Sequence, residues 1–208
     1  MERKVYLILT DTGTFFTRMI KLYTKKPYNH ASLSFDPHFS EIYSFGRKKP
    51  RNPFIGGFVK ECIYTGLLKQ ADCAIYSCCI SEQQYQKMLH FIKEIEEKKE
   101  QYRYNFLGLL AIPFHKTVHR EHAYFCSQFV AAVLTEGNVI QCSKQLSHMT
   151  PHDLQQVASF HLLYQGTVEG FIKKNSLMRK VRTEMKTHAA LGKLRQKIAS
   201  ACVFFFWY

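Results

Sequence analysis

The sequence predicts an α+β fold in which an antiparallel sheet packs against helices, with a basic helical tail at the C-terminus. Three observations support this prediction: short strand-like runs between turn signals, helices with apolar residues at helical spacing, and an excess of Lys and Arg near the end of the chain. We therefore divide the 208 residues into a folded domain, 1–172, and a basic amphipathic tail, 173–208.

The expected strands begin with residues 4–10, a continuous apolar run that is typical of a buried strand. Residues 30–36 alternate between polar and apolar side chains, which indicates a half-buried strand. A turn at Asp36-Pro37-His38 would return the chain into a hairpin partner at 41–45. We expect further strands at 58–64, 71–80 and 160–164, and a loop rich in Arg, Lys, Pro and Gly at 47–57.

Helices are expected at 14–23 and after Ser81, where Ser81 and Gln84 form a plausible capping box. The apolar residues that follow Ser81 recur at helical spacing. A second core helix is predicted over 124–134, with Gly137 after its end, and Pro151 opens a short helix.

Composition indicates a folded protein, because 46% of the residues are hydrophobic and 22% are charged. No apolar run reaches the roughly 18 residues that span a bilayer, and the first residues lack the pattern of a signal peptide. The seven cysteines form no regular framework, which favours reduced thiols. We therefore expect a cytoplasmic protein.

The net charge of +13 is concentrated in the tail, where nine Lys or Arg residues accompany a single acid, Glu184. Apolar residues recur at helical spacing between Leu177 and Ile198, and residues 203–208 are mostly aromatic. A basic amphipathic helix of this kind binds anionic membrane surfaces. We expect residues 173–208 to place the protein peripherally at the inner face of a membrane. Nucleic acid is a less favoured partner, because no recognised binding motif accompanies the charge.

Cys126 carries the strongest local signal for chemistry, because it lies near the expected start of an apolar helix. The positive end of the helix dipole and unpaired backbone N–H groups both favour a thiolate there. The alternative is an inert buried cysteine. A nucleophilic thiol needs a base, and His30, at the start of a strand, is the best candidate.

Two other constellations compete with this pair. His115, His119, His122 and Cys126 would line one face of a helix and could bind zinc, but the polar run is more typical of a loop, so we expect no metal and no other cofactor. The basic stretch 47–51 follows the expected site strand and could contact an anionic substrate, although a solvated loop is an equal alternative.

The order of these motifs resembles the NlpC-type papain-like superfamily. The resemblance rests on Tyr28-Asn29-His30-Ala31-Ser32-Leu33 opening a strand and, far downstream, on Phe125-Cys126-Ser127-Gln128-Phe129-Val130, with weaker support from 42–48, 53–61 and 150–154. Because His precedes Cys, it is closest to the circularly permuted branch, which contains the YiiX-like and lecithin retinol acyltransferase-like proteins. The resemblance covers roughly residues 4–172 and implies a permuted papain-like fold.

The resemblance also implies a mechanism. Cys126 would attack an acyl carbon, and His30 would accept the thiol proton and later protonate the leaving group. The family places a polar group that orients the histidine on the next strand, where Ser44 and Glu41 are the candidates. A three-residue turn at 36–38 would bring His30 opposite Ser44, but Glu41 has the better chemistry, so both stay open.

The backbone N–H of Cys126 is the first candidate for stabilising the oxyanion, and Tyr28 or Tyr124 could add a hydroxyl. We expect a cysteine hydrolase of amidase or peptidase type. The alternatives are a lipid-directed thiol acyltransferase or esterase, and a non-catalytic membrane- or partner-binding module of the same fold.

Overall fold

The structure is a computed structural model that describes residues 3–13, 21, 25–49, 52–65, 68–105 and 121–177. The predicted helix at 14–23, apart from residue 21, lies outside these residues, as do His115, His119 and the tail beyond 177. The chain divides into two compact units, Met1–Val168 and Glu169–Tyr208. In the second unit the described residues, 169–177, are helical, and Lys173 pairs with Glu169 one turn earlier at 2.9 Å.

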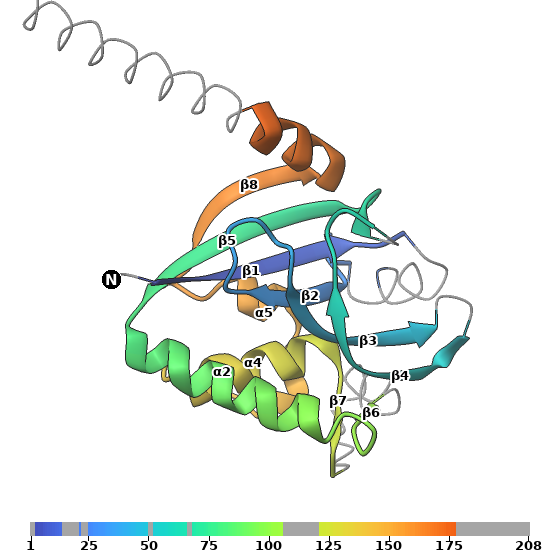
Figure 1. Ribbon diagram of the computed structural model, residues 1–208, viewed down its shortest axis with the longest axis vertical. Coiled ribbons are helices and arrows are strands. Elements are labelled where there is room, and N and C mark those ends of the chain that lie inside the picture. Colours follow the sequence, from blue (N-terminus) through green and yellow to red (C-terminus); the bar gives the residue numbers. More distant parts are fainter. Residues whose placement is uncertain are drawn as a thin grey trace, which may run out of the picture. The chain divides into compact units, whose positions relative to one another are not determined.

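The first unit is built on a six-stranded sheet in the order β4-β3-β2-β1-β5-β8 (Figure 1). All neighbouring strands are antiparallel, so the predicted α+β class with an antiparallel sheet is confirmed. The strands are β1 (Arg3–Asp11), β2 (His30–Ser34), β3 (Ile42–Lys49), β4 (Asn52–Glu61), β5 (Asp72–Ile80) and β8 (His161–Thr167).

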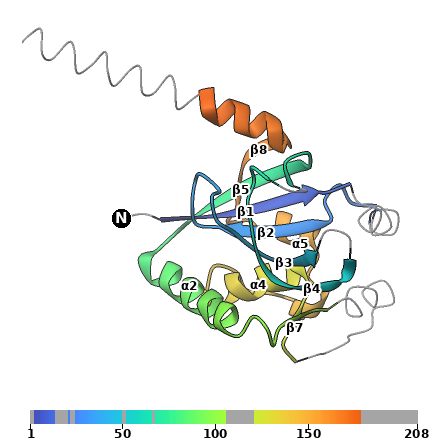
Figure 2. The ribbon, with the colours of Figure 1, turned by 45° about the vertical axis from the view of Figure 1, so that its right-hand side comes forward.

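The helices α2, α4 and α5, which the structure describes in the first unit, lie along one face of this sheet (Figures 1 and 2). Helix α2 (Glu82–Glu97) begins with the predicted capping box, in which Gln84 N donates to Ser81 Oγ at 3.1 Å. Helix α4 (Cys126–Glu136) packs against α2, β2 and β3. A 3₁₀ turn, η3 (Leu146–His148), and the short helix α5 (Pro151–Gln155) also pack against α4.

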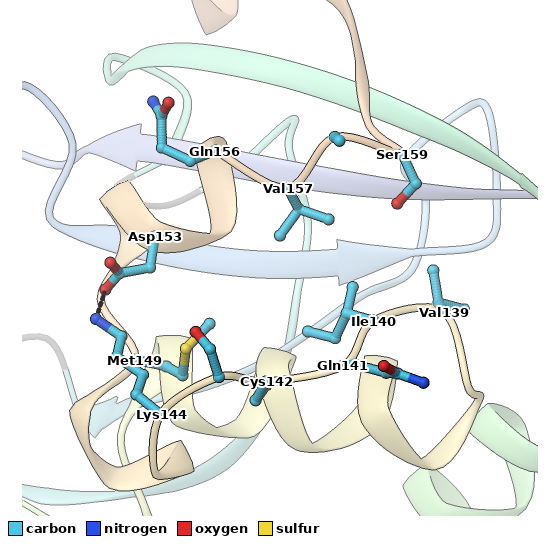
Figure 3. Close-up of a pocket in the computed structure, with 12 residues that line it drawn as sticks. Val139, Ile140, Gln141, Cys142, Lys144, Met149, Asp153, Gln156, Val157 and Ser159 are labelled. Atoms are coloured by element: carbon cyan, nitrogen blue, oxygen red, sulfur yellow. Dashed lines mark ion pairs between the residues drawn. The ribbon is translucent and has the colours of Figure 1, made fainter.

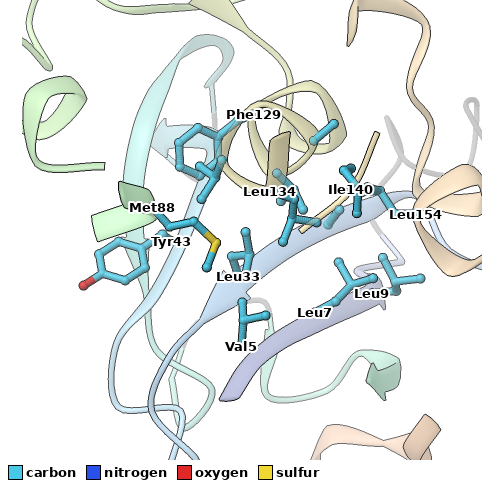
Figure 4. Close-up of a cluster of buried hydrophobic side chains, with 14 of the residues drawn as sticks. Val5, Leu7, Leu9, Leu33, Tyr43, Met88, Phe129, Leu134, Ile140 and Leu154 are labelled. Carbon is cyan, nitrogen blue, oxygen red and sulfur yellow. The ribbon is translucent and has the colours of Figure 1, made fainter. Parts of the chain in front are cut away.

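The core between the helices and the sheet explains why α4 is so apolar, because eight of its eleven residues are buried. Phe129 and Leu134 of α4 meet Leu33 of β2 and Met88 of α2 in one cluster (Figure 4). Burying side chains of this size contributes about 1.5–3 kcal/mol each. This packing fixes the first residue of α4 relative to the first residue of β2.

Residues 47–57 are not the loop that the sequence predicted. Strands β3 and β4 form a long hairpin through most of this stretch, with Ile42 opposite Glu61 and Gly46 opposite Gly57. A register shift between Arg47 and Lys49 marks a bulge near its tip. The Gly, Pro and basic residues that indicated a loop are tolerated because β4 is an edge strand.

The register between β2 and β3 also differs from the prediction. Leu33 pairs with Tyr43. In the same antiparallel register, Ser32 lies beside Ser44 and His30 lies beside Gly46. The connection is longer than three residues because the Asp36 carboxylate accepts the backbone N–H groups of His38 and Ser40 and holds a wider turn. Phe39 adopts a positive φ of 54° within it.

Two short parallel strands, β6 (Arg103–Tyr104) and β7 (Ala123–Tyr124), complete the unit and precede α4. β6 packs against β3 and β4. The close approach depends on Gly56, where an added Cβ would lie 2.7 Å from Tyr104 Cβ and 2.7 Å from Gly46 O. In the described residues, no helix has the length and apolar character required to cross a bilayer.

Gly56→Ala should therefore destabilise the protein by about 1–3 kcal/mol, the usual result of overpacking a close contact. Gly46→Ala is the matched control in the neighbouring strand, because its Cβ would meet its nearest atom, Val59 Cγ2, at 3.4 Å, an ordinary contact distance. Thermal unfolding of both variants measures the difference. Equal melting temperatures would contradict the proposed clash between Gly56 and Tyr104.

Candidate active site

Cys126 is the first residue of α4, so the structure places its thiol at the N-terminal end of a helix. Phe125, the N-cap residue, makes no side-chain hydrogen bond to the first turn, and no acidic residue lies in that turn. Cys126 itself is 4% exposed. The helix dipole and the uncapped N–H groups therefore act on the sulfur without a competing negative charge in the first turn.

His30 is the first residue of β2, and the packing of α4 on that strand brings its imidazole to Cys126. The Cys126 side chain is near enough to the imidazole to contribute to the raised pKa of His30. The structure thus brings together the two residues that the sequence singled out, although 95 residues separate them in the chain. The His30 side chain is 13% exposed, so it lies in a mostly desolvated position.

Glu61, the last residue of β4, completes the arrangement. Its carboxylate lies 2.9 Å (Oε1) and 3.2 Å (Oε2) from His30 Nε2, and it accepts a hydrogen bond from Ser32 Oγ at 2.7 Å. With Nε2 facing Glu61, Nδ1 is the imidazole nitrogen left for the Cys126 thiol. The base is therefore held between a carboxylate and a thiol.

The electrostatics of the pair favour its charged form. Burial alone would lower the pKa of His30, but the Glu61 charge and the contact with Cys126 raise that pKa well above its usual value. Burial would raise the pKa of Glu61, yet the His30 charge and the bonds from His30 and Ser32 lower it. Imidazolium and carboxylate stabilise each other in a site from which water is largely excluded.

The two residues that the sequence offered for orienting His30 lie in different places. Ser44 Oγ is 3.4 Å from His30 Nε2, at the outer limit of a hydrogen bond, and it donates to the Ala31 carbonyl at 2.8 Å. Glu41 instead binds Lys60 at 2.8 Å and accepts the Tyr43 hydroxyl, so its carboxylate is engaged away from His30. Among the described residues, Glu61 is the carboxylate that contacts the imidazole.

The segment before His30 is anchored to the end of β1. Asn29 N donates to the Thr10 carbonyl at 3.1 Å, and Asn29 Nδ2 donates to Asp11 Oδ1 at 2.8 Å. Lys21 pairs with the same carboxylate at 2.6 Å. Burial would raise the pKa of Asp11, but the bonds from Lys21 and Asn29 lower it, so this anchor is charged at neutral pH. The start of β2 is thereby fixed.

Tyr104 is a further residue at the site that the sequence analysis did not identify. It pairs with Tyr124 across β6 and β7, two residues before Cys126. Burial and the charge of Cys126 raise the pKa of its phenol well above the usual value. The phenol is therefore protonated at neutral pH and lies within electrostatic reach of the sulfur.

The two tyrosines named from the sequence occupy aromatic and core positions. Tyr124 stacks on Tyr102 at 6.0 Å and meets Phe45 edge-on at 5.3 Å. Tyr28 is 7% exposed and belongs to the hydrophobic core. Burial raises the pKa of both phenols.

A separate cavity of about 470 Å³ lies beside the residues that follow α4 (Figure 3). Ile140, Cys142 and Met149 line it, and the Lys144–Asp153 ion pair crosses its rim. Ser127, the residue after Cys126, donates a hydrogen bond to the Met149 carbonyl at 2.6 Å, so one side of the cavity approaches the N-terminal end of α4. This cavity does not contain the cysteine and histidine.

Comparisons with known proteins add no relative: no family model, no curated protein and no solved structure matches this chain. In the part of the chain that the structure describes, no group of three His, Cys, Asp or Glu side chains is arranged to hold a metal ion. The side chains that the site offers for chemistry are Cys126, His30 and Glu61, with the Tyr104 phenol nearby.

Proposed function

We propose that this protein is a cysteine hydrolase of amidase or peptidase type with a permuted NlpC-type papain-like fold. The observation that carries the proposal is the convergence of Cys126, His30 and Glu61 at the N-terminal end of α4. A thiol, an imidazole and an orienting carboxylate in this order form the nucleophile, base and third group of covalent acyl transfer.

In the first half of the reaction, His30 accepts the proton of the Cys126 thiol and the sulfur attacks the acyl carbon of the substrate. Negative charge develops on the carbonyl oxygen, where backbone N–H groups at the start of α4 stabilise it. The protonated phenol of Tyr104 is the nearby side-chain donor that we propose for the same oxygen. His30 then donates its proton to the leaving group, which departs and leaves a thioester on Cys126.

In the second half, His30 removes a proton from the incoming nucleophile, which attacks the thioester and releases Cys126. Water as the nucleophile gives hydrolysis, and an alcohol or amine gives acyl transfer. Glu61 holds the imidazole in place and stabilises its protonated form in both halves. A lipid-directed acyltransferase or esterase uses the same residues and remains the alternative proposal, and a basic tail at a membrane would favour it.

Alkylation by iodoacetamide tests the proposal without a known substrate. Cys79 is exposed and Cys126 is 4% exposed, so accessibility alone favours Cys79. At pH 6 only a small fraction of an ordinary thiol, with a pKa of about 8.5, is ionised. We expect Cys126 to react faster than Cys79 at this pH, as measured by peptide mass spectrometry over time.

The control is the same reaction after unfolding in urea, where the two rates should converge because the helix and the imidazole no longer act on Cys126. Faster labelling of Cys79 in the folded protein at pH 6 would count against a nucleophilic role for Cys126, and would favour a binding module of the same fold.

A further inference from the structure

Ser32 of β2 contacts both the base and the carboxylate of the candidate site. It lies two residues after His30, so the two side chains are on the same face of the strand. Ser32 Oγ donates its proton to Glu61 Oε2 at 2.7 Å, while Glu61 Oε1 lies 2.9 Å from His30 Nε2. Ser32 is 0% exposed, so water does not compete for its hydroxyl. The serine therefore holds one carboxylate oxygen while the other lies against the imidazole.

The Glu61 carboxylate depends on these two contacts. In the part of the chain that the structure describes, the side chains that hydrogen-bond to it are those of His30 and Ser32. Lys60, the preceding residue of β4, pairs with two other carboxylates, each at 2.8 Å, and so is not the counter-charge of Glu61. The Glu61 side chain is 19% exposed, so water replaces a lost donor only in part. Without the Ser32 hydroxyl, His30 alone would orient the carboxylate.

The same contacts determine which nitrogen of neutral His30 carries the proton. Ser32 Oγ lies 3.2 Å from His30 Nε2, and because its own proton is donated to Glu61, this oxygen accepts from the imidazole. Ser44 Oγ, at 3.4 Å from Nε2, donates to the Ala31 carbonyl and is also an acceptor on this side. These hydroxyl oxygens and the carboxylate all favour a hydrogen on Nε2. The lone pair is then on Nδ1, the nitrogen left for the Cys126 thiol.

We propose that Ser32 is a positioning residue of this site, which holds the Glu61 carboxylate against Nε2 of His30 and so keeps Nδ1 ready to accept the proton of Cys126. The proposal rests on the hydrolase function above and adds to it the residue that orients the carboxylate. Ser32 acts through Glu61 and not on the substrate. Its removal should therefore change the ionisation of Glu61, an effect that a purely structural serine in β2 would not have.

Titration of the Glu61 carboxyl group tests this role without a substrate. Protein labelled with ¹³C at the glutamate side-chain carboxyl is followed by NMR, and the Glu61 signal is the one that Glu61→Ala removes. We expect Ser32→Ala to move the titration of Glu61 to higher pH, because the hydrogen bond from Ser32 favours the charged form and lowers the pKa of this carboxyl.

Ser34→Ala is the matched control for the titration. Ser34 is also 0% exposed and lies on the same face of β2, but its hydroxyl donates to the Glu41 carbonyl at 2.7 Å. The titration of Glu61 should be unchanged in this variant. Thermal unfolding checks that each protein is folded. If Ser32→Ala is too unstable to study, Ser32→Cys should give a shift in the same direction, because a thiol is a weak hydrogen-bond donor.

A double-mutant cycle tests whether Ser32 acts through the carboxylate. We expect Ser32→Ala alone to lower kcat for hydrolysis of p-nitrophenyl butyrate about 10-fold, the value of a hydrogen bond to a charged group. Added to Glu61→Ala, the same change should lower kcat further by less than about 2-fold, because the carboxylate that Ser32 positions is absent. Ser34→Ala should leave kcat close to that of the wild type.

Three results would overturn the proposal: a Glu61 titration that Ser32→Ala leaves in place, an equal shift in Ser34→Ala, or a full loss of kcat when Ser32→Ala is added to Glu61→Ala. Failure of the proposed function is a different result. In that case the wild type does not hydrolyse the ester, and Cys126 also fails the alkylation test at pH 6. The carboxyl titration needs no turnover, so it still decides whether Ser32 controls Glu61.

Discussion

Cys126→Ala should abolish turnover of any acyl substrate, with a fall in kcat of at least about 10³-fold, because removal of a covalent nucleophile eliminates the thioester pathway. The side chain is nearly buried, so the change deletes one sulfur atom from a tightly packed helix start and costs little else. Hydrolysis of p-nitrophenyl butyrate, followed by absorbance, measures the effect without requiring the natural substrate.

Cys78→Ala is the matched control, since Cys78 is also a free, buried cysteine, on β5. It should retain activity while losing a similar amount of stability. Activity that survives in Cys126→Ala, with an unfolding curve like that of the wild type, would mean that the thiol is not the nucleophile.

Glu61→Gln should lower kcat by about 10²-fold or more, because an amide neither orients the imidazole as firmly nor stabilises its charge. The pH profile should change as well. Glu61 raises the pKa of His30, so its loss should lower that pKa and move the alkaline limb of the rate profile to lower pH. Rates measured from pH 4 to pH 10 test both effects.

The same pair predicts how stability depends on pH. The folded-state pKa of His30 is raised, so its contribution is complete below the usual value near 6.5 and is lost as pH rises through the raised pKa. The folded-state pKa of Glu61 is lowered, so its contribution is present above about 4.5 and is lost as pH falls through the lowered pKa. The pair therefore stabilises the fold most between about pH 4.5 and about pH 6.5, where both contributions are complete.

Glu41→Gln is the control for the rate profile, because Glu41 binds Lys60 and Tyr43 rather than the imidazole. It should leave the rate profile unchanged. An alkaline limb that moves equally in both variants would show that Glu61 has no specific action on His30.

Much of the fold follows from local patterns in the sequence. The apolar run of β1, the capping box of α2 and the helix that begins at Cys126 and ends near Gly137 all lie close to where these patterns placed them. Each depends on short-range physics: capping, helical spacing, or alternation across a strand. The proximity of Cys126 and His30 was expected from motif order rather than from any local pattern.

Glu61 was missed because its role depends on strand pairing over long range. The glycines and basic residues at 47–57 indicated a loop. Without the β3–β4 hairpin, no pattern in the sequence placed Glu61, the last residue of β4, opposite Ile42 of β3. Ser44 was favoured by a register that the wider turn at Asp36 displaces by two residues. One signal in the sequence does point to Glu61: this carboxylate ends the strand that follows the strands of His30 and Ser44 in the chain.

Tyr104 was beyond the reach of the sequence for a related reason. Its position results from the close contact that Gly56 permits between the β3–β4 hairpin and β6, and a glycine in a basic stretch indicates flexibility before it indicates a tertiary contact.

The placement of α4 against β2 also has a consequence during synthesis of the chain. The ribosome releases the imidazole and the carboxylate first, and the sulfur emerges more than sixty residues after Glu61. A nascent polypeptide that ends before α4 therefore carries a base with nothing to activate. Under the proposed mechanism, the active thiol forms only when α4 packs on strands that were synthesised much earlier. A nascent chain without α4 therefore has no catalytic activity.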